Sequence, residues 1–296
     1  KMVFLGGPRQ VGKTTLARTF IKKESQYLNW DLAADKIKIL RSQIDIEQKL
    51  IVLDEIHKYA KWRSLVKGYF DKYYPKLNFL VTGSARLDHF RKGGDSLVGR
   101  YHYHRLHPFS LLEINKRPTA RDVNLLLKFG GFPEPFLRQN SVQHQRWQFE
   151  RIARVTAQDL RDLETVKDIS LLELLVHSLN SRIAQPLSIK SLQEDLDVSP
   201  NTVDRWIGLL ETVYYCFRVV PYGPPKIKAV KKTPKLYLWD WSEVESPGAR
   251  FENLVASQLL KFCHQQEDTL GLKTELRYFK DVVTLREIDF IVLQKG

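Results

Sequence analysis

Residues 7–14 have the sequence GPRQVGKT, and they follow a short apolar run at 2–5. The octapeptide fits the pattern G-x-x-x-x-G-K-[ST] at every defined position. It lies between a predicted strand and a predicted helix at 13–23, which is the context that a phosphate-binding loop (P-loop) requires. The glycines at 7 and 12 allow the backbone to wrap so that successive N–H groups face phosphate oxygens. The pattern predicts a nucleotide phosphate site, and a chance glycine-rich turn is the alternative.

The loop supplies most of the predicted ligands. Lys13 has the length to reach the β- and γ-phosphates, and the Thr14 hydroxyl is placed to ligate Mg²⁺. We expect ATP or ADP with Mg²⁺ as the bound species. The predicted binding residues of the loop and first helical turn are Gly7, Pro8, Arg9, Gln10, Val11, Gly12, Lys13, Thr14 and Thr15.

A second motif supplies carboxylates. The buried-strand run at 50–53 ends in Asp54 and Glu55, and the end of a parallel strand lies at the ligand edge of its sheet. We expect Asp54 to hold Mg²⁺ through water and Glu55 to polarise the attacking water. In isolation, a strand end that reaches solvent is the alternative.

The order of elements indicates an α/β fold. Apolar runs at 2–5, 27–30, 50–53 and 79–82, with a further strand near 100–106, alternate with helices such as 62–74. This arrangement is typical of a parallel sheet covered on both faces. A helical stretch at 121–168 follows, interrupted by the glycine–proline breaker at 130–133.

Residues 169–240 contain three predicted helices and a strand pair, which is the outline of a winged helix. Ser188 and Ser199 are the expected N-caps of the second and third helices. The third helix presents Asn201, Thr202 and Arg205, which are residue types that contact DNA. The hairpin carries six basic residues and no acidic one: Arg218, Lys226, Lys228, Lys231, Lys232 and Lys235. A structural or protein-contact role is the alternative, because Asp204 and Glu211 dilute the charge of the third helix.

The net charge of +13 suggests a polyanionic partner, but it is unevenly distributed. Residues 1–118 hold 23 basic and 11 acidic residues, and residues 119–296 hold 24 and 23. The excess therefore argues little for a DNA-reading module in the second half. Two cysteines (Cys216 and Cys263), together with no leader and no apolar run of ~18 residues, predict a cytoplasmic location without membrane contact.

The chain resembles bacterial and archaeal AAA+-type ATPases that carry a C-terminal winged helix and a restriction-endonuclease-like domain. The resemblance covers nearly the whole chain, and it rests on these segments: GGPRQVGKTT (6–15), LDEIHK (53–58), TGS (82–84), LVGR (97–100), LHPFS (106–110), GGFPE (130–134), KLY (235–237) with Asp240, FEN (251–253) and EIDF (287–290). The extra strand and helix at 27–41 match the ATPase branch of P-loop proteins. The implied division is an ATPase core at 1–118, a helical lid at 119–168, a winged helix at 169–240 and a partial nuclease-like domain at 241–296.

The resemblance also implies residue roles. Ser84, or failing that Thr82, corresponds to a sensor that bridges water and γ-phosphate, with a self-capped turn as the alternative. Arg100 corresponds to an arginine finger for a neighbouring copy in a homo-oligomer, with a surface arginine at a helix end as the alternative. Pro133 corresponds to a lid residue that contacts adenine.

Two further carboxylates, Glu252 and Asp289, match two members of an endonuclease site. Its Glu-x-Lys strand would follow Gly296, so the chain is interpreted as part of a longer protein and DNA cleavage by it is not expected.

The leading functional hypothesis is Mg²⁺-dependent ATP hydrolysis coupled to DNA or partner-protein binding. The alternative is a nucleotide-gated switch with negligible turnover.

Overall fold

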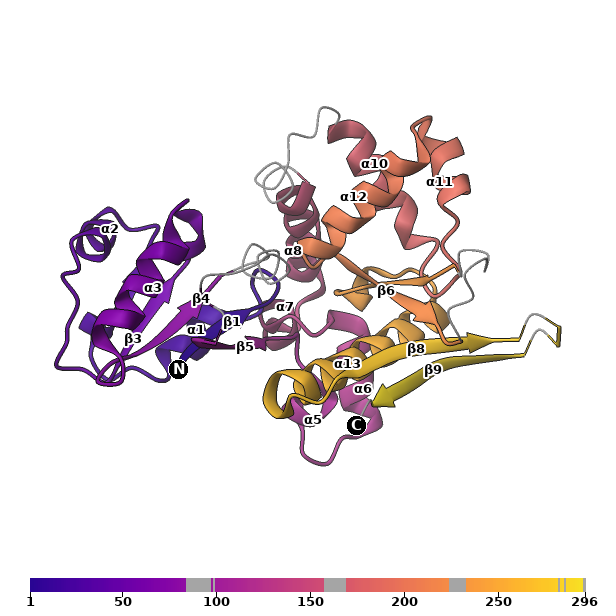
Figure 1. Ribbon diagram of the computed structural model, residues 1–296. Coiled ribbons are helices and arrows are strands. Elements are labelled where there is room, and N and C mark those ends of the chain that lie inside the picture. The colour runs from indigo at the N-terminus through magenta and orange to yellow at the C-terminus, as the bar shows by residue number, and fades with distance from the viewer. Residues whose placement is uncertain are drawn as a thin grey trace. The chain divides into compact units, whose positions relative to one another are not determined.

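The computed structural model describes residues 1–83, 97, 99–156, 169–223, 233–281, 283–284 and 286–294 (Figure 1). The chain divides into two compact units, Lys1–His107 and Pro108–Gly296. Among the described residues, no helix combines the length and the apolar character needed to cross a membrane.

The first unit alternates strands and helices, as the sequence predicts. Strand β1 leads into the phosphate loop and β3 ends at Asp54. The elements are β1 (Met2–Gly6), α1 (Lys13–Arg18), η1 (Glu24–Gln26), β2 (Tyr27–Asn29), α2 (Ala33–Leu40), β3 (Leu50–Asp54), η2 (Ile56–Lys58), α3 (Trp62–Tyr73), β4 (Asn78–Thr82) and β5 (Tyr101–Arg105).

The five strands form one parallel sheet in the order β2-β3-β4-β1-β5. Strand β4 therefore lies between β1 and β3, and β2 extends the sheet beyond β3. This order confirms the mixed α/β fold with a parallel sheet, as expected for P-loop ATPases. It also brings the carboxyl ends of β1, β3 and β4 to the same edge.

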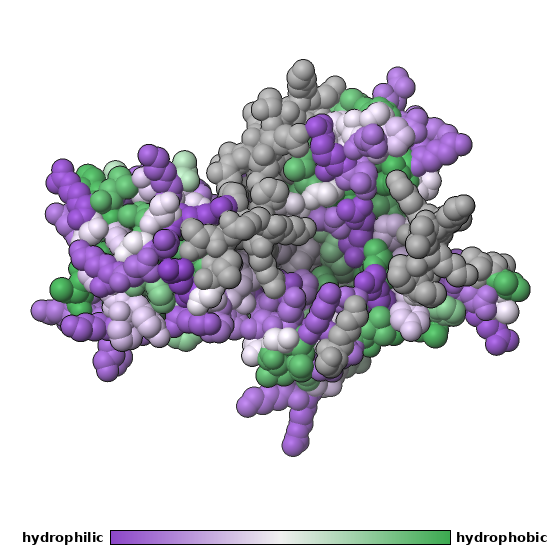
Figure 2. Space-filling view, in the orientation of Figure 1, coloured by the Kyte–Doolittle hydropathy of each residue, from purple (hydrophilic) through white to green (hydrophobic). Residues whose placement is uncertain are grey.

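Side chains that alternate along the strands form a core on each face of the sheet. Ile51 and Leu53 belong to one cluster with Phe79 and Trp62, whereas Val52 belongs to the other with Ala17. A strand whose residues are all apolar is typical of a sheet that is buried on both faces. Hydrophilic residues predominate on the drawn face of this unit, with smaller apolar patches between them (Figure 2).

The second unit begins with helices and ends in a mixed sheet. Its helices are α5 (Leu111–Ile114), α6 (Ala120–Phe129), α7 (Pro133–Arg138), α8 (Ser141–Arg154), α10 (Ile169–Asn180), α11 (Ile189–Leu196), α12 (Pro200–Thr212), η5 (Trp241–Glu243) and α13 (Pro247–Leu270). Its strands are β6 (Cys216–Pro221), β7 (Lys235–Leu238), β8 (Thr274–Lys280) and β9 (Glu287–Gln294).

The three helices α10–α12 precede the antiparallel pair β6 and β7. Both expected caps are confirmed, since the Ser188 side chain accepts from Ser191 N and the Ser199 side chain accepts from Thr202 N. Strand β6 also pairs with β8, so the four strands form one sheet in the order β7-β6-β8-β9. The name winged helix, the nuclease-like comparison and the four-part division remain predictions.

Candidate functional site

The phosphate loop joins β1 to α1 and holds the predicted binding residues at 7–12. Gly7 has φ 138°, and a Cβ there would lie 2.3 Å from the Leu106 carbonyl oxygen. Gly12 has φ 98°, which is also a conformation that favours glycine. Both glycines are therefore required by the backbone of the loop. Thr15 lies in the first turn of α1, after Lys13 and Thr14.

The Lys13 ammonium lies within this loop. Its Nζ donates to the Gly7 and Pro8 carbonyl oxygens, at 3.0 and 2.6 Å, and the residue is only 6% exposed. These carbonyls hold the charged end of the side chain beside the loop backbone. A phosphate oxygen that entered the loop could replace them as the acceptor.

Asp54 lies at the carboxyl end of β3 and receives hydrogen bonds from three strands or helices. Thr14 Oγ1 donates to Asp54 Oδ2 at 2.8 Å, and the Tyr27 hydroxyl donates to the same oxygen at 2.5 Å. The Thr82 hydroxyl at the end of β4 donates to Oδ1. At 2% exposed, the carboxylate has only hydroxyl donors among the residues described. Its orientation is thus fixed, and its negative charge has no cation beside it there.

Thr14 and Asp54 fit a magnesium site. Mg²⁺ prefers oxygen ligands and usually keeps several waters. The hydroxyl and carboxylate oxygens of these two residues are already adjacent, and the carboxylate is the kind of buried anion that a cation stabilises. The donor set therefore suits the metal that the sequence predicts.

Glu55 follows in the left-handed conformation, with φ 56°. This turn directs its carboxylate toward Lys58, whose Nζ lies 3.3 Å from Oε2, and toward His57, whose Nε2 lies 3.7 Å from the same oxygen. Lys58 also pairs with Asp31 at 2.6 Å. The predicted water-activating carboxylate is thus held by an ion pair in this structure.

The remaining predicted site residues are Arg100, Ser84 or Thr82, and Pro133. Arg100 lies just before β5, in the first unit, and its Nε donates to Asp71 Oδ1 at 3.1 Å. Ser84 lies outside the described residues. Thr82, the second choice for the sensor, directs its hydroxyl at Asp54. Pro133 begins α7 in the second unit.

Tyr27 is the residue of this site that the sequence patterns did not single out. Burial, followed by the neighbouring Asp54, raises its pKa, so its hydroxyl remains a donor at ordinary pH. In the register of β2 on β3, Tyr27 lies opposite Val52, two residues before Asp54, and its hydroxyl reaches the Asp54 carboxylate. Only the strand order, which the sequence does not give directly, could have identified it.

The glycines at 130–131 pack against the segment at 240–242 within the second unit. Gly130 has φ 70°, and a Cβ there would lie 2.5 Å from Asp240 Oδ1. A Cβ on Gly131 would lie 2.5 Å from the Trp241 ring. This packing explains why both glycines are needed. The adenine contact of Pro133 stays a prediction.

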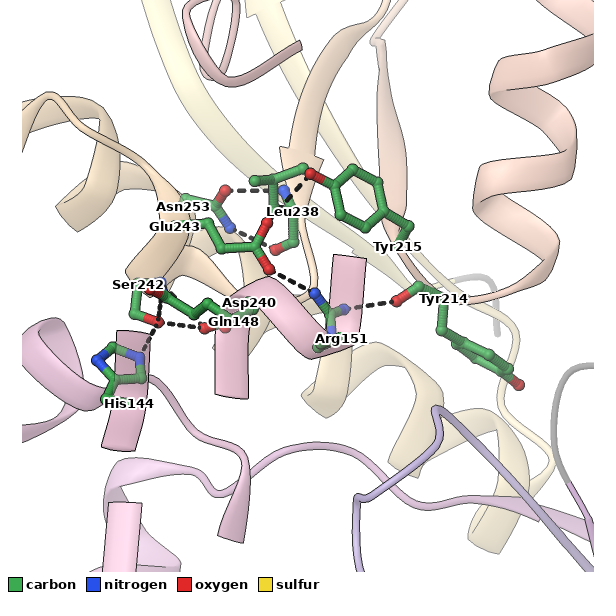
Figure 3. Close-up of polar contacts among 10 residues, drawn as sticks. All are labelled: His144, Gln148, Arg151, Tyr214, Tyr215, Leu238, Asp240, Ser242, Glu243 and Asn253. Carbon is green, nitrogen blue, oxygen red and sulfur yellow. Dashed lines mark hydrogen bonds and ion pairs between the residues drawn. The ribbon is translucent and has the colours of Figure 1, made fainter. Parts of the chain in front are cut away.

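A buried polar network surrounds this segment (Figure 3). Asp240 Oδ1 accepts from the Ser242 backbone N–H and hydroxyl, at 3.1 and 2.6 Å, and Ser242 Oγ lies 3.0 Å from His144 Nε2. Asp240 Oδ2 is buried without a hydrogen-bond partner among the residues described. Burial lowers the pKa of His144, which favours its neutral form.

The same network contains a buried ion pair. Arg151 Nη1 donates to Glu243 Oε1 at 2.6 Å, Nη2 donates to the Tyr214 carbonyl oxygen at 3.3 Å, and the Tyr215 hydroxyl donates to Glu243 Oε2 at 3.1 Å. Both charged side chains are less than one tenth exposed. Burial raises the pKa of Glu243 to about 7, against the opposing effect of Arg151. The pair links α8 to η5 and to Tyr214 and Tyr215, which directly precede β6.

Two basic residues assigned to the predicted wing have acidic partners. The Arg218 guanidinium donates to Glu211 (Nη2 to Oε2, 2.6 Å) and to Asp204 (Nη1 to Oδ1, 2.8 Å). The inclusion of Lys235 in a free basic wing is wrong, because its side chain is 3% exposed and lies among carboxylates. The four lysines between them lie outside the described residues.

The partners of Lys235 include the two carboxylates that resembled an endonuclease site. Its Nζ lies 3.0 Å from Glu252 Oε1, 2.5 Å from Glu287 Oε1 and 3.1 Å from Asp289 Oδ1. The Tyr237 hydroxyl also donates to Glu252, at 2.8 Å. An ammonium therefore occupies the centre of this carboxylate group, and no metal-binding cluster is found among the described residues.

Comparisons with known proteins agree with the fold of the first unit. The family described as "AAA domain" matches residues 1–115, and the family described as "Domain of unknown function (DUF8612)" matches residues 120–243. Together with the phosphate loop and the five-stranded parallel sheet, the first match supports an AAA-type, nucleotide-binding ATPase fold for this part of the chain.

Two similar proteins match most of this chain. "Uncharacterized protein Rv2008c" of Mycobacterium tuberculosis is 24% identical over 243 residues, which are 81% of this chain and 54% of that protein. "Uncharacterized protein MJ1544" of Methanocaldococcus jannaschii is 22% identical over 99% of this chain and 72% of its own length. The chain thus spans about half the length of its mycobacterial relatives.

Among solved structures, the Aeropyrum pernix ORC1 protein in complex with DNA is similar with a TM-score of 0.36 and 16% identity, over 88% of this chain and 87% of that one.

Proposed function

We propose that the first unit binds ATP with Mg²⁺ and hydrolyses it. The observation that carries the proposal is the 2.8 Å hydrogen bond between Thr14 and Asp54, the two predicted metal ligands, which lie forty positions apart in the chain. The Lys13 ammonium beside the loop carbonyls supports it. The match of residues 1–115 to an AAA domain is consistent with this assignment.

Each residue has a distinct part in the proposed reaction. Lys13 exchanges the loop carbonyls for phosphate oxygens, and Thr14 and Asp54 hold the metal. Bound Mg²⁺ supplies charge that offsets the phosphates. Glu55 accepts a proton from water once its carboxylate leaves Lys58. Ser84 orients that water in this proposal.

Arg100 is proposed to complete the site of a neighbouring copy. Its present bond to Asp71 would then be exchanged for the transferred phosphate of that copy. Arginine fingers are worth about 10³–10⁵ in rate in related phosphoryl transfers. A dependence of turnover on protein concentration would follow from this arrangement.

The direct test compares three variants in steady-state ATP hydrolysis and in nucleotide binding. We expect Lys13→Ala to abolish hydrolysis and Glu55→Gln to bind ATP without turnover. The control, Lys22→Ala, removes an exposed lysine of the same unit and should match the wild type. Undiminished turnover in both Lys13→Ala and Glu55→Gln would reject the assignment.

The second unit is proposed to couple the nucleotide state to DNA or to a partner protein. The support is that Asn201 and Arg205 are exposed on α12, the third of the helices that precede β6 and β7. Pro133 is proposed to contact the adenine, as the resemblance implies. Retention of duplex DNA, measured with and without ATP, separates DNA contact from protein contact.

A nucleotide-gated switch with negligible turnover is the second candidate. It is favoured by the ion pairs that Glu55 makes with Lys58 and that Arg100 makes with Asp71. Tight ATP binding with no turnover, at any protein concentration and with or without duplex DNA, would identify the switch. Turnover that rises with concentration or with DNA would identify the ATPase.

A further inference from the structure

Tyr27 acts on one particular oxygen of Asp54. Its hydroxyl donates to Oδ2 at 2.5 Å, which is the oxygen that also accepts from Thr14 Oγ1 at 2.8 Å. Thr82 donates to the other oxygen, Oδ1. The hydroxyls of Thr14 and Tyr27 therefore meet at the same oxygen of Asp54, Oδ2.

The tyrosine is itself held rigidly. It is 5% exposed and packs in the cluster that contains Leu5 and Val52. The Arg18 guanidinium carbon lies 4.1 Å from the centre of its ring, and Arg18 belongs to α1, one turn beyond Thr14. Its hydroxyl is thus fixed relative to both the loop helix and β3.

A carboxylate needs such partners to keep one orientation. The χ2 rotation of an aspartate is broad, so its plane is set by the hydrogen bonds that it accepts. With Thr82 on one oxygen and Tyr27 on the other, the plane of Asp54 is defined from both sides. Removing the Tyr27 hydroxyl leaves Oδ2 with Thr14, itself a predicted metal ligand, as its remaining donor among the described residues.

We propose that Tyr27 is a positioning residue for Mg²⁺, whose hydroxyl holds Asp54 Oδ2 in the orientation in which it binds the hydrated cation together with Thr14. The inference deepens the proposed function, on which it rests. Outer partners of metal ligands typically change metal affinity by about 10- to 100-fold when they are removed. A loss near the lower end is expected here, because Thr82 still holds Oδ1.

The test is a Tyr27→Phe variant, which keeps the ring and removes only the hydroxyl. Binding of a fluorescent ADP analogue is measured in EDTA and over a Mg²⁺ titration, and Mn²⁺ binding is followed by electron paramagnetic resonance. We expect the affinity in EDTA to stay within about twofold of the wild type. The Mg²⁺ and Mn²⁺ concentrations at half-saturation should rise about tenfold.

The control is Tyr69→Phe. Tyr69 is also a buried tyrosine of the first unit, and its hydroxyl donates to the Ile39 carbonyl oxygen, away from Asp54. This variant loses a comparable hydrogen bond and should keep the wild-type metal dependence. Thr82→Val should shift the metal dependence less than Tyr27→Phe, because Thr82 does not contact Oδ2.

The outcomes separate the inference from the proposed function. Wild-type protein that binds no nucleotide, or binds it equally with and without metal, overturns both. A metal-dependent wild type with an unchanged Tyr27→Phe overturns the inference alone. Equal shifts in Tyr27→Phe and Thr82→Val would show general loosening of the site and would also overturn it.

Discussion

Replacing Arg151 by methionine should destabilise the second unit strongly. The variant leaves the Glu243 carboxylate, which is 3% exposed, with the Tyr215 hydroxyl as its remaining donor among the described residues. It also removes the donor to the Tyr214 carbonyl. Removing one partner of a buried ion pair typically costs about 3–5 kcal/mol. We expect about 3 kcal/mol at pH 7, since partial protonation of Glu243 limits the cost.

The pH dependence tests the physical reason. The pKa of Glu243 is raised from 4.5 to about 7, so between these values the folded chain keeps a proton that the unfolded chain has lost. Stability from this group is therefore fully present below pH 4.5 and falls as pH rises to 7, by at most about 1.4 kcal/mol per unit. Without Arg151 the pKa moves above 7. In the variant, the stability of the second unit should then continue to fall up to pH 8, with a further loss of about 1 kcal/mol.

Urea unfolding followed by tryptophan fluorescence provides the measurement, because four of the six tryptophans lie in the second unit: Trp147, Trp206, Trp239 and Trp241. The surface pair of Lys190 and Glu194, at 3.7 Å, supplies the control. Lys190→Met should cost less than about 0.5 kcal/mol. The double variant Arg151→Met/Glu243→Leu should recover most of the loss. A cost below 1 kcal/mol, or no added pH dependence above pH 7, would refute the reasoning.

Three further predictions concern single side chains. Gly130→Ala should cost about 1–3 kcal/mol because of its positive φ and the nearby carboxylate, whereas Gly208→Ala in the middle of α12 should stabilise by up to about 1 kcal/mol; urea unfolding distinguishes them. Lys235→Met should lower the melting temperature more at pH 8 than at pH 4, because the carboxylates around it repel one another only when ionised. Arg100→Ala should abolish any rise of ATP turnover with protein concentration while leaving nucleotide binding intact; a retained rise would exclude the finger role.

The features that the sequence predicted well are local. The loop at 7–14, the strand ending at Asp54 and the caps at Ser188 and Ser199 depend on residues that are adjacent or a helical turn apart. Short-range patterns fix such features because backbone conformation and capping are decided within a few residues. The alternation of strands and helices likewise sufficed to predict the parallel sheet.

The features that the sequence did not predict depend on partners far along the chain. Tyr27 meets Asp54 only because β2 lies beside β3, and Lys235 contacts Asp289, which lies 54 positions further along the chain. The Lys235 error has a physical cause: a charge count along a hairpin cannot show which side chains face acidic residues from elsewhere. Likewise the sequence predicts a breaker at the glycines of 130–131, but their fit against the segment at 240–242 depends on residues more than 100 positions away.

Residues proposed to act on nucleotide are occupied by the chain's own groups in this structure. Lys13 donates to loop carbonyls, Glu55 pairs with Lys58 and Arg100 donates to Asp71. Each of these bonds would have to be exchanged before the corresponding step of the proposed hydrolysis. A phosphate could replace the loop carbonyls as the acceptor of Lys13, whereas Arg100 is proposed to meet the phosphate of a neighbouring copy. We therefore expect the protein to bind ATP even under conditions in which it hydrolyses ATP slowly. A neighbouring copy or a polyanionic partner should raise the rate of hydrolysis more than the affinity for ATP.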